Sequence, residues 1–475
     1  MFESGWKIFP AAFFLLVNFS ASGVKPLFFL RLTYFLFLLA LFFFCRRFDL
    51  KRILAPISAG IAAIVFLYGI AQKFILFPFI LEKPDSLHSF FAQAMRARVA
   101  SGRIFAIFPL PTLYAMVCGL LLIFSIHYLY HARGWSRVFW FFLLLLGAFN
   151  LVLTQSFGGI IFFTLAVLFY LFVSGVFKIK YLAPLLMVMA LVFFTVTALR
   201  FSEARELAPL KLRFANWLQA GRVIAAAPLL GVGLGNYEAA MPAHVYPGEP
   251  ASIYAHNFFL QLAAESGVPL FLVLIALSFP FLKKNLANLL HPENALFASA
   301  AILILLFNIF DVGNYFFAAG ISFAVVFSQL VRVECPLRLR HFAVTALLAV
   351  VLLVSEAGAA QQRTADLWLG RQDLVQAAAH YRRALALSPL AFRSWLGLAH
   401  IAWQQNDFSK AERILKKVLQ IYPEQAYANY RLSQTAQRRG AYLTALVHAR
   451  QAAAADKKNR EYQRWHEFIQ ANFAR

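Results

Sequence analysis

Long uninterrupted apolar runs constrain this chain more than any other feature. They follow one another over the first three quarters of its 475 residues. Continuous apolar runs of roughly 18 or more residues form membrane-spanning helices, because a soluble fold cannot bury so many of them. The runs fall at about 8–22, 27–45, 53–71, 104–126, 137–154, 157–177, 181–199, 256–282, 295–313, 315–331 and 341–358. The sequence therefore predicts an all-α, polytopic membrane protein with about eleven transmembrane helices.

The composition agrees with a membrane protein and argues against a soluble one. Hydrophobic residues make up 61% of the chain and charged residues only 14%. The net charge of +23 would suggest nucleic acid in a soluble protein, but here the basic residues cluster in short loops between apolar runs. We find no nucleic-acid motif, so we expect membrane lipids and no nucleic acid as partners. The first run reads as a retained span, without a cleavable signal peptide.

The basic loops predict the orientation. They follow the second, fourth, sixth, eighth and tenth runs, and contain Arg46, Arg47, Lys51, Arg52, Arg133, Arg137, Lys178, Lys180, Lys283, Lys284, Arg332, Arg338 and Arg340. Positive loops remain in the cytoplasm. The longer polar loops at about 72–103 and 200–255 should then lie outside. With an odd number of spans, so should everything after residue 358.

The cysteines and acidic residues predict neither a disulfide nor a metal site. Cys45, Cys118 and Cys335 are far apart and lack ligand spacing, so we interpret them as free thiols. The outer loops contain no Asp-x-Asp element and no His/carboxylate cluster. We expect no metal and no cofactor.

The tail at 362–475 differs in kind, because its hydrophobicity is periodic. Pro389 and Pro423 are 34 residues apart, as are Ala377, Ala411 and Ala445. This is the tetratricopeptide period of two antiparallel helices per repeat. Asn406-Asp407 and Gly440 mark the turns within repeats, and we expect two good repeats with a partial one before or after. Such repeats bind proteins or help assemble complexes, so a protein partner is possible.

The tail is also basic, with 18 Lys and Arg against 8 Asp and Glu. Two interpretations stay open for this charge: a solvated surface, or attraction to anionic lipid or glycan.

Chemistry-bearing residues gather between 200 and 267. Arg205, Arg213 and Arg222 lie beside a membrane helix, where the planar guanidinium can bind phosphate or simply reach lipid headgroups. His256 enters a predicted span from a polar loop, and a neutral imidazole there can take a proton from a hydroxyl. The alternative is a structural, hydrogen-bonded histidine. Glu265 is a carboxylate in an apolar run, which is usually functional.

The order of these pieces resembles the O-antigen ligase/O-antigen polymerase superfamily of bacterial polytopic glycan transferases. The resemblance rests on Arg213-Phe-Ala-Asn-Trp217, on Pro228-Leu-Leu-Gly231-Val-Gly233-Leu-Gly235, and on His256-Asn257 followed by Glu265-Ser-Gly267. It spans roughly 60–330. The glycines are not a nucleotide fingerprint, because no βαβ unit surrounds them. We interpret them as tight turns that bring backbone amides near the membrane surface.

The resemblance implies a GT-C-like helical fold in the inner membrane, and the loop charges with the odd number of spans place the tail in the periplasm. It implies a polyprenyl-diphosphate glycan donor, no nucleotide sugar and no obligatory metal. Within it, Arg213 would bind the diphosphate and His256 would activate the acceptor hydroxyl. Asp311 would orient His256 or bind acceptor. The further substrate-binding candidates are Arg98, Arg103, Arg205, Arg222, Asn257, Gln261 and Glu265.

One position departs from the family pattern. Members often carry a Ser-Arg-Gly element between the fifth and sixth spans, but this chain has Ser156-Phe157-Gly158. Arg98, Arg103 or Arg205 would have to replace the missing arginine, unless the donor is bound differently. Thr112 likewise stands where the family usually has Asn.

The acceptor stays open. It is lipid A-core in a ligase, another carrier-linked glycan in a polymerase, and a Ser or Thr in a protein O-oligosaccharyltransferase. The block at 213–267 favours the ligase. A lipid-linked glycan transporter is a rival, but we find no internal repeat between span halves. A scaffold is another rival, although eleven spans exceed what an anchor needs.

Overall fold

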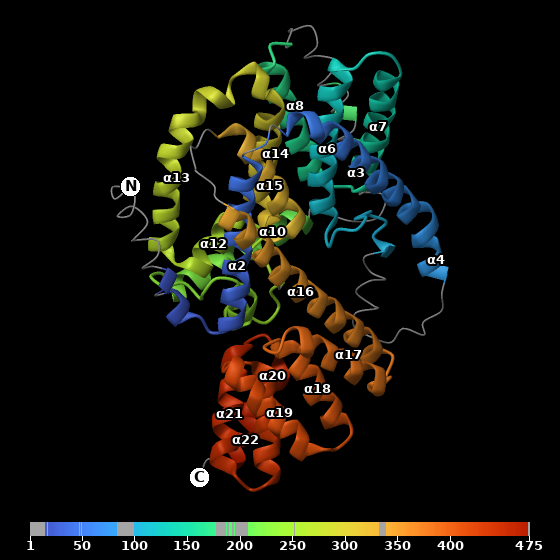
Figure 1. Cartoon of the computed structure of the whole chain (residues 1–475). Coiled ribbons are helices and arrows are strands. Elements are labelled where there is room, and N and C mark those ends of the chain that lie inside the picture. The colour runs from blue at the N-terminus through green and yellow to red at the C-terminus, as the bar shows by residue number, and fades with distance from the viewer. Residues whose placement is uncertain are drawn as a thin grey trace.

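The computed structural model describes residues 15–16, 18–46, 48, 50–82, 99–176, 187, 190–191, 194, 208–250, 252–331 and 339–473. Within these ranges the secondary structure is helical and no strand occurs (Figure 1). The all-α prediction is confirmed for this part of the chain.

Six helices in the described ranges are long and apolar enough to cross a membrane, or seven if one bent pair counts as a span. The six segments are Lys25–Cys45, Ile53–Leu76, Pro111–His131, Gly134–Leu153, Pro292–Phe310 and Thr345–Gly370. Phe157–Val173 and Phe317–Leu330 are shorter apolar helices. The predicted count of eleven is therefore not confirmed. About half of the first predicted run, 8–22, and most of the seventh, 181–199, lie outside the described residues.

Helix α6 (Pro111–His131) is the centre of the largest core. It packs against α3 (Lys51–Ala71), α7 (Gly134–Leu153), α8 (Phe157–Val173) and α14 (Ala295–Phe310). Its side chains Tyr114, Met116 and Leu122 are fully buried. Because neighbouring helices surround α6, its sequence is apolar all round and has no polar face. Its first turn is thereby fixed beside the end of α14.

A second packed group joins α2 (Lys25–Cys45), α15 (Phe317–Leu330) and α16 (Leu339–Gly370). The buried contact is made by Tyr34, Phe37, Leu38, Ala324 and Leu352. Helix α16 continues without a break from a predicted span into the tail, so a single rigid element joins the two (Figure 1).

The run at 256–282, predicted as one span, is two helices. α12 (Phe258–Ser266) ends at Gly267, and α13 (Val268–Leu289) begins after it. Gly267 has φ +77°, and a Cβ there would come within 2.5 Å of Leu229 O. The left-handed conformation and the close backbone approach both require glycine. α13 itself bends by 54° near Pro280. The run predicted as one span is therefore broken at Gly267 into a short helix and a longer, bent one.

A small outer layer covers this break. It contains α10 (Ala208–Ala226), α11 (Tyr237–Ala240) and the turn η3 (Met241–His244). Its core is made of Ala220, Val223, Tyr237, Met241, Val245, Ala255 and Ala264. The predicted outer loop at 200–255 is thus folded over much of its length. The loop also ends at the start of α12, so this helix fixes the position of its last residues.

The tail contains paired antiparallel helices, as the 34-residue period predicts. Two full pairs are α18 (Phe392–Gln404) with α19 (Phe408–Ile421), and α20 (Ala426–Arg438) with α21 (Tyr442–Ala455). α17 (Leu374–Leu387) packs against α16 before them, and α22 (Arg460–Phe473) follows. The turns at Gln372, Asn406 and Gly440 have φ of 60°, 59° and 74°, at the same 34-residue interval.

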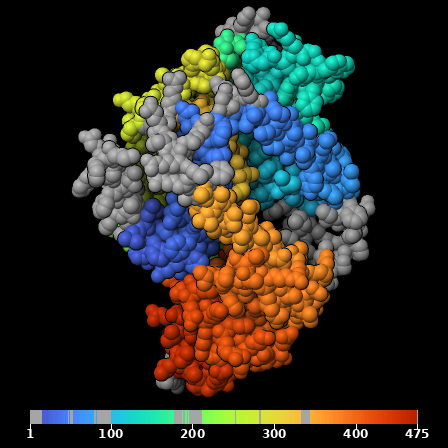
Figure 2. Space-filling model, in the orientation of Figure 1, coloured from blue at the N-terminus to red at the C-terminus, as the bar shows by residue number. Residues whose placement is uncertain are grey.

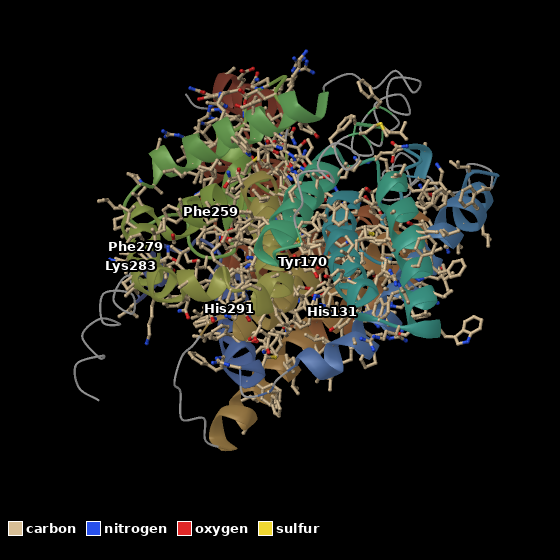
Figure 3. All side chains as sticks on the ribbon, turned by 90° about the horizontal axis from the view of Figure 1, so that it is seen from above. His131, Tyr170, Phe259, Phe279, Lys283 and His291 are labelled. Carbon is tan, nitrogen blue, oxygen red and sulfur yellow. The ribbon has the colours of Figure 1, made fainter. Side chains whose placement is uncertain are left out.

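The tail lies at one end of the molecule, as the orange and red mass in Figure 2 shows. The α6–α7 and α13–α14 connections lie at the opposite end (Figure 1). Seen from above, Phe279 and Lys283 of α13 lie at the rim of the bundle (Figure 3). The α6–α7 connection, which contains Arg133, and the tail thus lie at opposite ends of the molecule.

Candidate functional site

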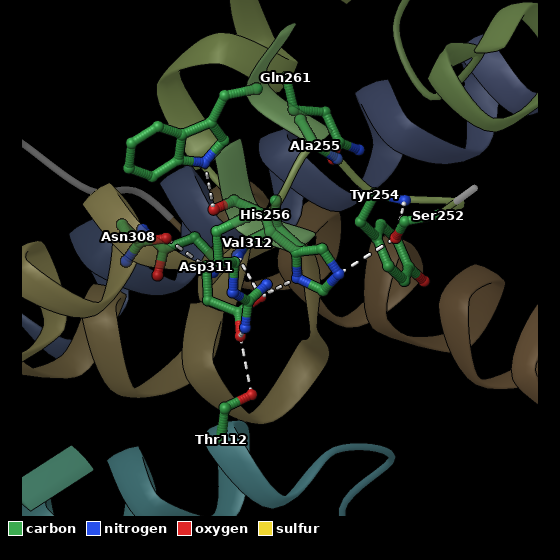
Figure 4. A network of polar contacts seen from close by, with 12 residues as sticks. Thr112, Ser252, Tyr254, Ala255, His256, Gln261, Asn308, Asp311 and Val312 are labelled. Atoms are coloured by element: carbon green, nitrogen blue, oxygen red, sulfur yellow. Dashed lines mark hydrogen bonds and ion pairs between the residues drawn. The ribbon is translucent and has the colours of Figure 1, made fainter. Parts of the chain in front are cut away.

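Asp311 is the centre of a polar network at the end of α14. Its Oδ1 accepts hydrogen bonds from His256 Nδ1 at 3.0 Å and from Val312 N at 2.9 Å. Its Oδ2 accepts from Thr112 Oγ1 at 2.7 Å and from Arg213 Nη2 at 3.1 Å (Figure 4). The Asp311 side chain is only 8% exposed. The start of α6, helix α10 and the segment before α12 therefore converge on one carboxylate.

The Asp311 contact fixes the tautomer of His256. A carboxylate that accepts from Arg213 and Thr112 has no hydrogen to offer, so His256 Nδ1 must be the donor. The Nε2 lone pair then faces Ser252, whose Oγ lies 3.1 Å away. His256 Nε2 can therefore accept a proton, which is the property a general base needs.

The backbone around His256 is held in a costly conformation. His256 has φ 52°, in the left-handed region that non-glycine residues rarely adopt. Trp217 Nε1 donates to His256 O at 3.1 Å, and Phe258 N donates to Asp311 O at 3.1 Å. These bonds anchor both sides of the strained residue, and such strain is common at functional sites.

Arg213 reaches this network from α10, and its side chain is 19% exposed. The structure thus brings together three residues singled out from the sequence: Arg213, His256 and Asp311. The contact with Asp311 also means that Arg213 does not point freely into a cleft.

Glu265 belongs to a separate, structural network. It is 1% exposed, and its carboxylate accepts from Gly235 N, from Tyr315 Oη and from Gln261 Nε2 at 2.7, 2.7 and 3.2 Å. With these donors and almost no exposure, Glu265 and Gln261 are poorly placed to bind substrate. Their position suits a role in holding the glycine block instead.

The glycine block forms the tight turns that the sequence indicates, and its amides hydrogen-bond within the protein. Gly231, Gly233 and Gly235 all have positive φ. A Cβ at Gly231 would come within 2.4 Å of Glu265 O. Val232 N and Gly233 N donate to Ala264 O and Glu265 O at the end of α12. These backbone hydrogen bonds fix the C-terminal end of α12 against the glycine block.

Asn257 also has a structural role, because its side chain caps α12 by accepting from Leu260 N at 2.9 Å. Arg222 binds Glu249 through two nitrogens at 2.7 and 2.8 Å and lies over the Tyr246 ring. This contact holds the pKa of Glu249 below its usual value. Arg222 therefore braces the outer loop.

Arg103 lies at the corner between α7 and α8. Its Nε donates to Thr154 O at 2.9 Å, and Ile104 N donates to Leu153 O at 3.2 Å. This is the corner that contains Phe157, the first residue of α8. Arg98 and Arg205, the other two candidates, lie outside the described residues.

Two residues in or beside these polar networks, Ser252 and Arg31, were not predicted from the sequence. Ser252 contacts His256 only because the chain turns back at a positive φ, and no local pattern signals that. Arg31 is a lone arginine in the apolar run of α2, and an intramembrane charge could have marked it.

Arg31 is half-buried and opens onto a cavity of about 130 Å³. Its Nη1 donates to Tyr315 O at 3.0 Å, and its guanidinium lies over the Tyr315 ring. Leu27, Leu30 and Leu352 form apolar parts of the cavity lining, and Glu356 adds a second charge. The lining of the cavity is therefore both charged and apolar.

A metal site is not evident in the described ranges, where no group of three or more His, Cys, Asp or Glu side chains is arranged to hold an ion.

Comparison with known proteins identifies the class of each part. A family model described as O-antigen ligase matches residues 141–275, which include Arg213 and His256. A tetratricopeptide repeat model matches residues 369–434. No curated protein matches the chain. The chain is therefore similar to O-antigen ligases over 141–275 and to tetratricopeptide repeats over 369–434, and both predicted resemblances are confirmed.

These matches indicate a general function and location, with which the structure agrees. The ligase region supports a role in glycan transfer. The apolar helices and the family together indicate a multi-pass membrane protein. The tail repeats suggest interaction with protein.

Proposed function

We propose that this protein transfers a glycan from a polyprenyl-diphosphate carrier to an acceptor hydroxyl at the periplasmic face of a bacterial inner membrane, as an O-antigen ligase does. One observation carries the proposal. Asp311 contacts the candidate base His256 through one oxygen, at 3.0 Å, and the candidate phosphate ligand Arg213 through the other, at 3.1 Å. Glycan transfer needs these two functions around one anomeric carbon, because the hydroxyl loses its proton on one face of the sugar while the diphosphate departs from the other.

On the acceptor side, His256 Nε2 takes the hydroxyl proton. The resulting imidazolium faces Asp311, which stabilises the charge. The hydroxyl oxygen then attacks the anomeric carbon from the face opposite the diphosphate, so the configuration inverts.

On the donor side, Arg213 stabilises the departing diphosphate. One of its nitrogens contacts Asp311, and a guanidinium has five N–H donors in all. Charge builds up on the leaving oxygen during transfer, so a fixed cation there lowers the barrier. The Arg31 cavity, with its apolar wall, supports a place for the carrier lipid nearby.

Arg103 is the best candidate to replace the family arginine that this chain lacks at Phe157. Its hydrogen bond to Thr154 O holds it at the same corner. Arg98 and Arg205 stay candidates for the same role. We give Arg222 a structural role in the outer loop instead, because its guanidinium is already paired with the Glu249 carboxylate.

A second candidate function is transfer to a protein Ser or Thr. The tail contacts the outer layer beside the site: Tyr422 Oη donates to Ala239 O at 2.8 Å, and Arg393 pairs with Glu238. A protein bound by the tail would therefore be held close to His256. Chain extension by a polymerase stays a third possibility.

The test is transfer in vitro from a purified polyprenyl-diphosphate glycan. We expect His256→Ala and Arg213→Ala each to slow transfer by at least about 100-fold, the usual contribution of a positioned base or charge. The matched control is His291→Ala, because His291 is a largely exposed histidine at the α13–α14 connection (Figure 3). This variant should keep full activity.

The acceptors distinguish the alternatives. Product on lipid A-core supports a ligase, longer carrier-linked chains without it support a polymerase, and product on a Ser-containing protein supports the second candidate. A folded His256→Ala variant with full transfer would refute the assigned base. No product under any condition would favour a transporter or a scaffold.

A further inference from the structure

Ser252 occupies the position at His256 Nε2 that an acceptor hydroxyl must take. Its Oγ lies 3.1 Å from Nε2, within the range of a hydrogen bond (Figure 4). Because His256 Nδ1 donates to Asp311, the hydrogen in this contact comes from Ser252. Ser252, His256 and Asp311 therefore form a continuous relay from a hydroxyl to a carboxylate.

The segment that carries Ser252 is anchored on both sides. Gln219 Nε2 donates to Pro250 O at 2.6 Å, and Tyr254 N donates to Ser252 Oγ at 3.3 Å. The Tyr254 ring packs against Phe316 at 5.4 Å. The hydroxyl is thus held at the base by the surrounding fold, where any external acceptor would have to displace it.

We infer that Ser252 is an internal acceptor, which the protein glycosylates when donor is bound and no external acceptor is present. The inference rests on the proposed function. Ser252 Oγ attacks the anomeric carbon of the donor and forms a new C–O bond, while its proton passes to His256 Nε2. The bond between the anomeric carbon and the diphosphate oxygen breaks, and its electron pair leaves with the polyprenyl diphosphate. No other reactant is required.

The product is an O-glycosyl serine, which is a stable glycoside. It no longer has a hydroxyl at the base, so the reaction stops after one glycan per chain. An external acceptor competes with Ser252 for the same position, so its presence suppresses the modification.

The experiment incubates purified full-length protein with a polyprenyl-diphosphate glycan and no acceptor, followed by intact mass and peptide mapping. We expect a mass increase of one glycan on the peptide that contains Ser252. Ser252→Thr keeps a hydroxyl and should keep the modification. Ser252→Ala and His256→Ala should lose it. Ser355→Ala removes a serine from α16 and serves as the matched control.

A second measurement uses an external acceptor. Ser252→Ala should lower the KM for that acceptor by about two- to tenfold, the effect of one hydrogen bond that no longer has to be displaced. A higher KM or lost transfer would mean that Ser252 assists the acceptor, which would overturn the inference.

The outcomes separate the two proposals. His256-dependent transfer to an external acceptor, with no glycan on Ser252 in its absence, overturns the inference and leaves the proposed function standing. Glycan on other residues but not on Ser252 does the same. Neither product under any condition overturns both.

Discussion

At the scale of the residue, one carboxylate unites the candidate chemistry. Asp311 determines the tautomer of His256 and also holds Arg213 and Thr112 in place. A change at Asp311 should therefore affect both halves of the proposed reaction, whereas a change at Thr112 removes only one of the contacts.

We predict that Asp311→Asn slows glycan transfer by about 10²- to 10⁴-fold, the contribution of a correctly oriented general base. The amide can donate to His256 Nδ1, so the imidazole would present a hydrogen at Nε2 and could not accept a proton. The measurement is kcat for transfer in vitro, with folding checked by thermal unfolding.

The control for this prediction is Thr112→Ser, which keeps the hydroxyl that donates to Asp311 Oδ2. It should keep transfer within a fewfold of the wild type. Equal loss in Thr112→Ser and Asp311→Asn would show that the carboxylate has no special part in catalysis.

At the scale of the element, the break between α12 and α13 separates the short helix that follows His256 from the longer apolar helix after it. One straight helix through 256–282 would leave no short α12 for the glycine block to hold. Gly267 allows the break. Hydrogen bonds from the block of Gly231, Gly233 and Gly235 to Glu265 then hold the end of α12 in place.

We predict that Gly267→Ala destabilises the protein by at least about 1–3 kcal/mol, the cost of a non-glycine residue in a sparsely populated conformation. The new Cβ would also approach Leu229 O to 2.5 Å. The measurement is thermal unfolding in detergent.

Gly221→Ala is the matched control in the same part of the protein. Gly221 lies within α10, has ordinary helical φ, and a Cβ there would meet nothing within 4 Å. Alanine should stabilise a helix at such a position by up to about 1 kcal/mol. Equal loss of stability in both variants would contradict our explanation of the break.

At the scale of the whole molecule, the tail is joined to the rest of the chain by α16 and by side-chain contacts with the outer layer. Helix α16 connects it to the membrane part, and α19 and α18 contact α11 through Tyr422 and Arg393. The tail is therefore docked beside the outer layer rather than hanging from its linker.

We predict that Arg393→Glu weakens this docking, because it places two negative charges together at Glu238. Hydrogen exchange of the amides in 237–246 should become faster, by no more than about fivefold because exposed ion pairs contribute about 1 kcal/mol or less. The double variant Arg393→Glu/Glu238→Arg should restore protection. Arg450→Glu, an exposed charge reversal on α21, should leave the exchange unchanged. Unchanged protection in the single variant would contradict the docking.

We predict that the tail is periplasmic, since it lies opposite the α6–α7 connection that contains the basic Arg133. A cysteine at Lys458 should react with an impermeant maleimide in cells with a permeabilised outer membrane. A cysteine at Arg133 should react only after lysis. Cys45 and Cys118 are buried, and Cys335→Ser removes the third thiol. The opposite labelling pattern would invert the proposed topology.

The sequence by itself determined the membrane class and the tail, and it predicted the neighbourhood of the candidate site. These follow from short-range patterns: apolar runs, a 34-residue period, and the order of Arg213, the glycines and His256. Such patterns can be recognised without knowledge of the fold, because a bilayer and a repeat both impose a fixed spacing on the chain.

Only the tertiary structure decided which residues meet. Asp311 lies 55 residues from His256 and 98 from Arg213, and Thr112 lies 199 residues away from it. No local spacing encodes such contacts. Glu265 shows the reverse case, because its charge in an apolar run predicted substrate binding, yet its partners give it a structural role. A hydrogen bond depends on positions in space, and packing of distant helices alone sets them.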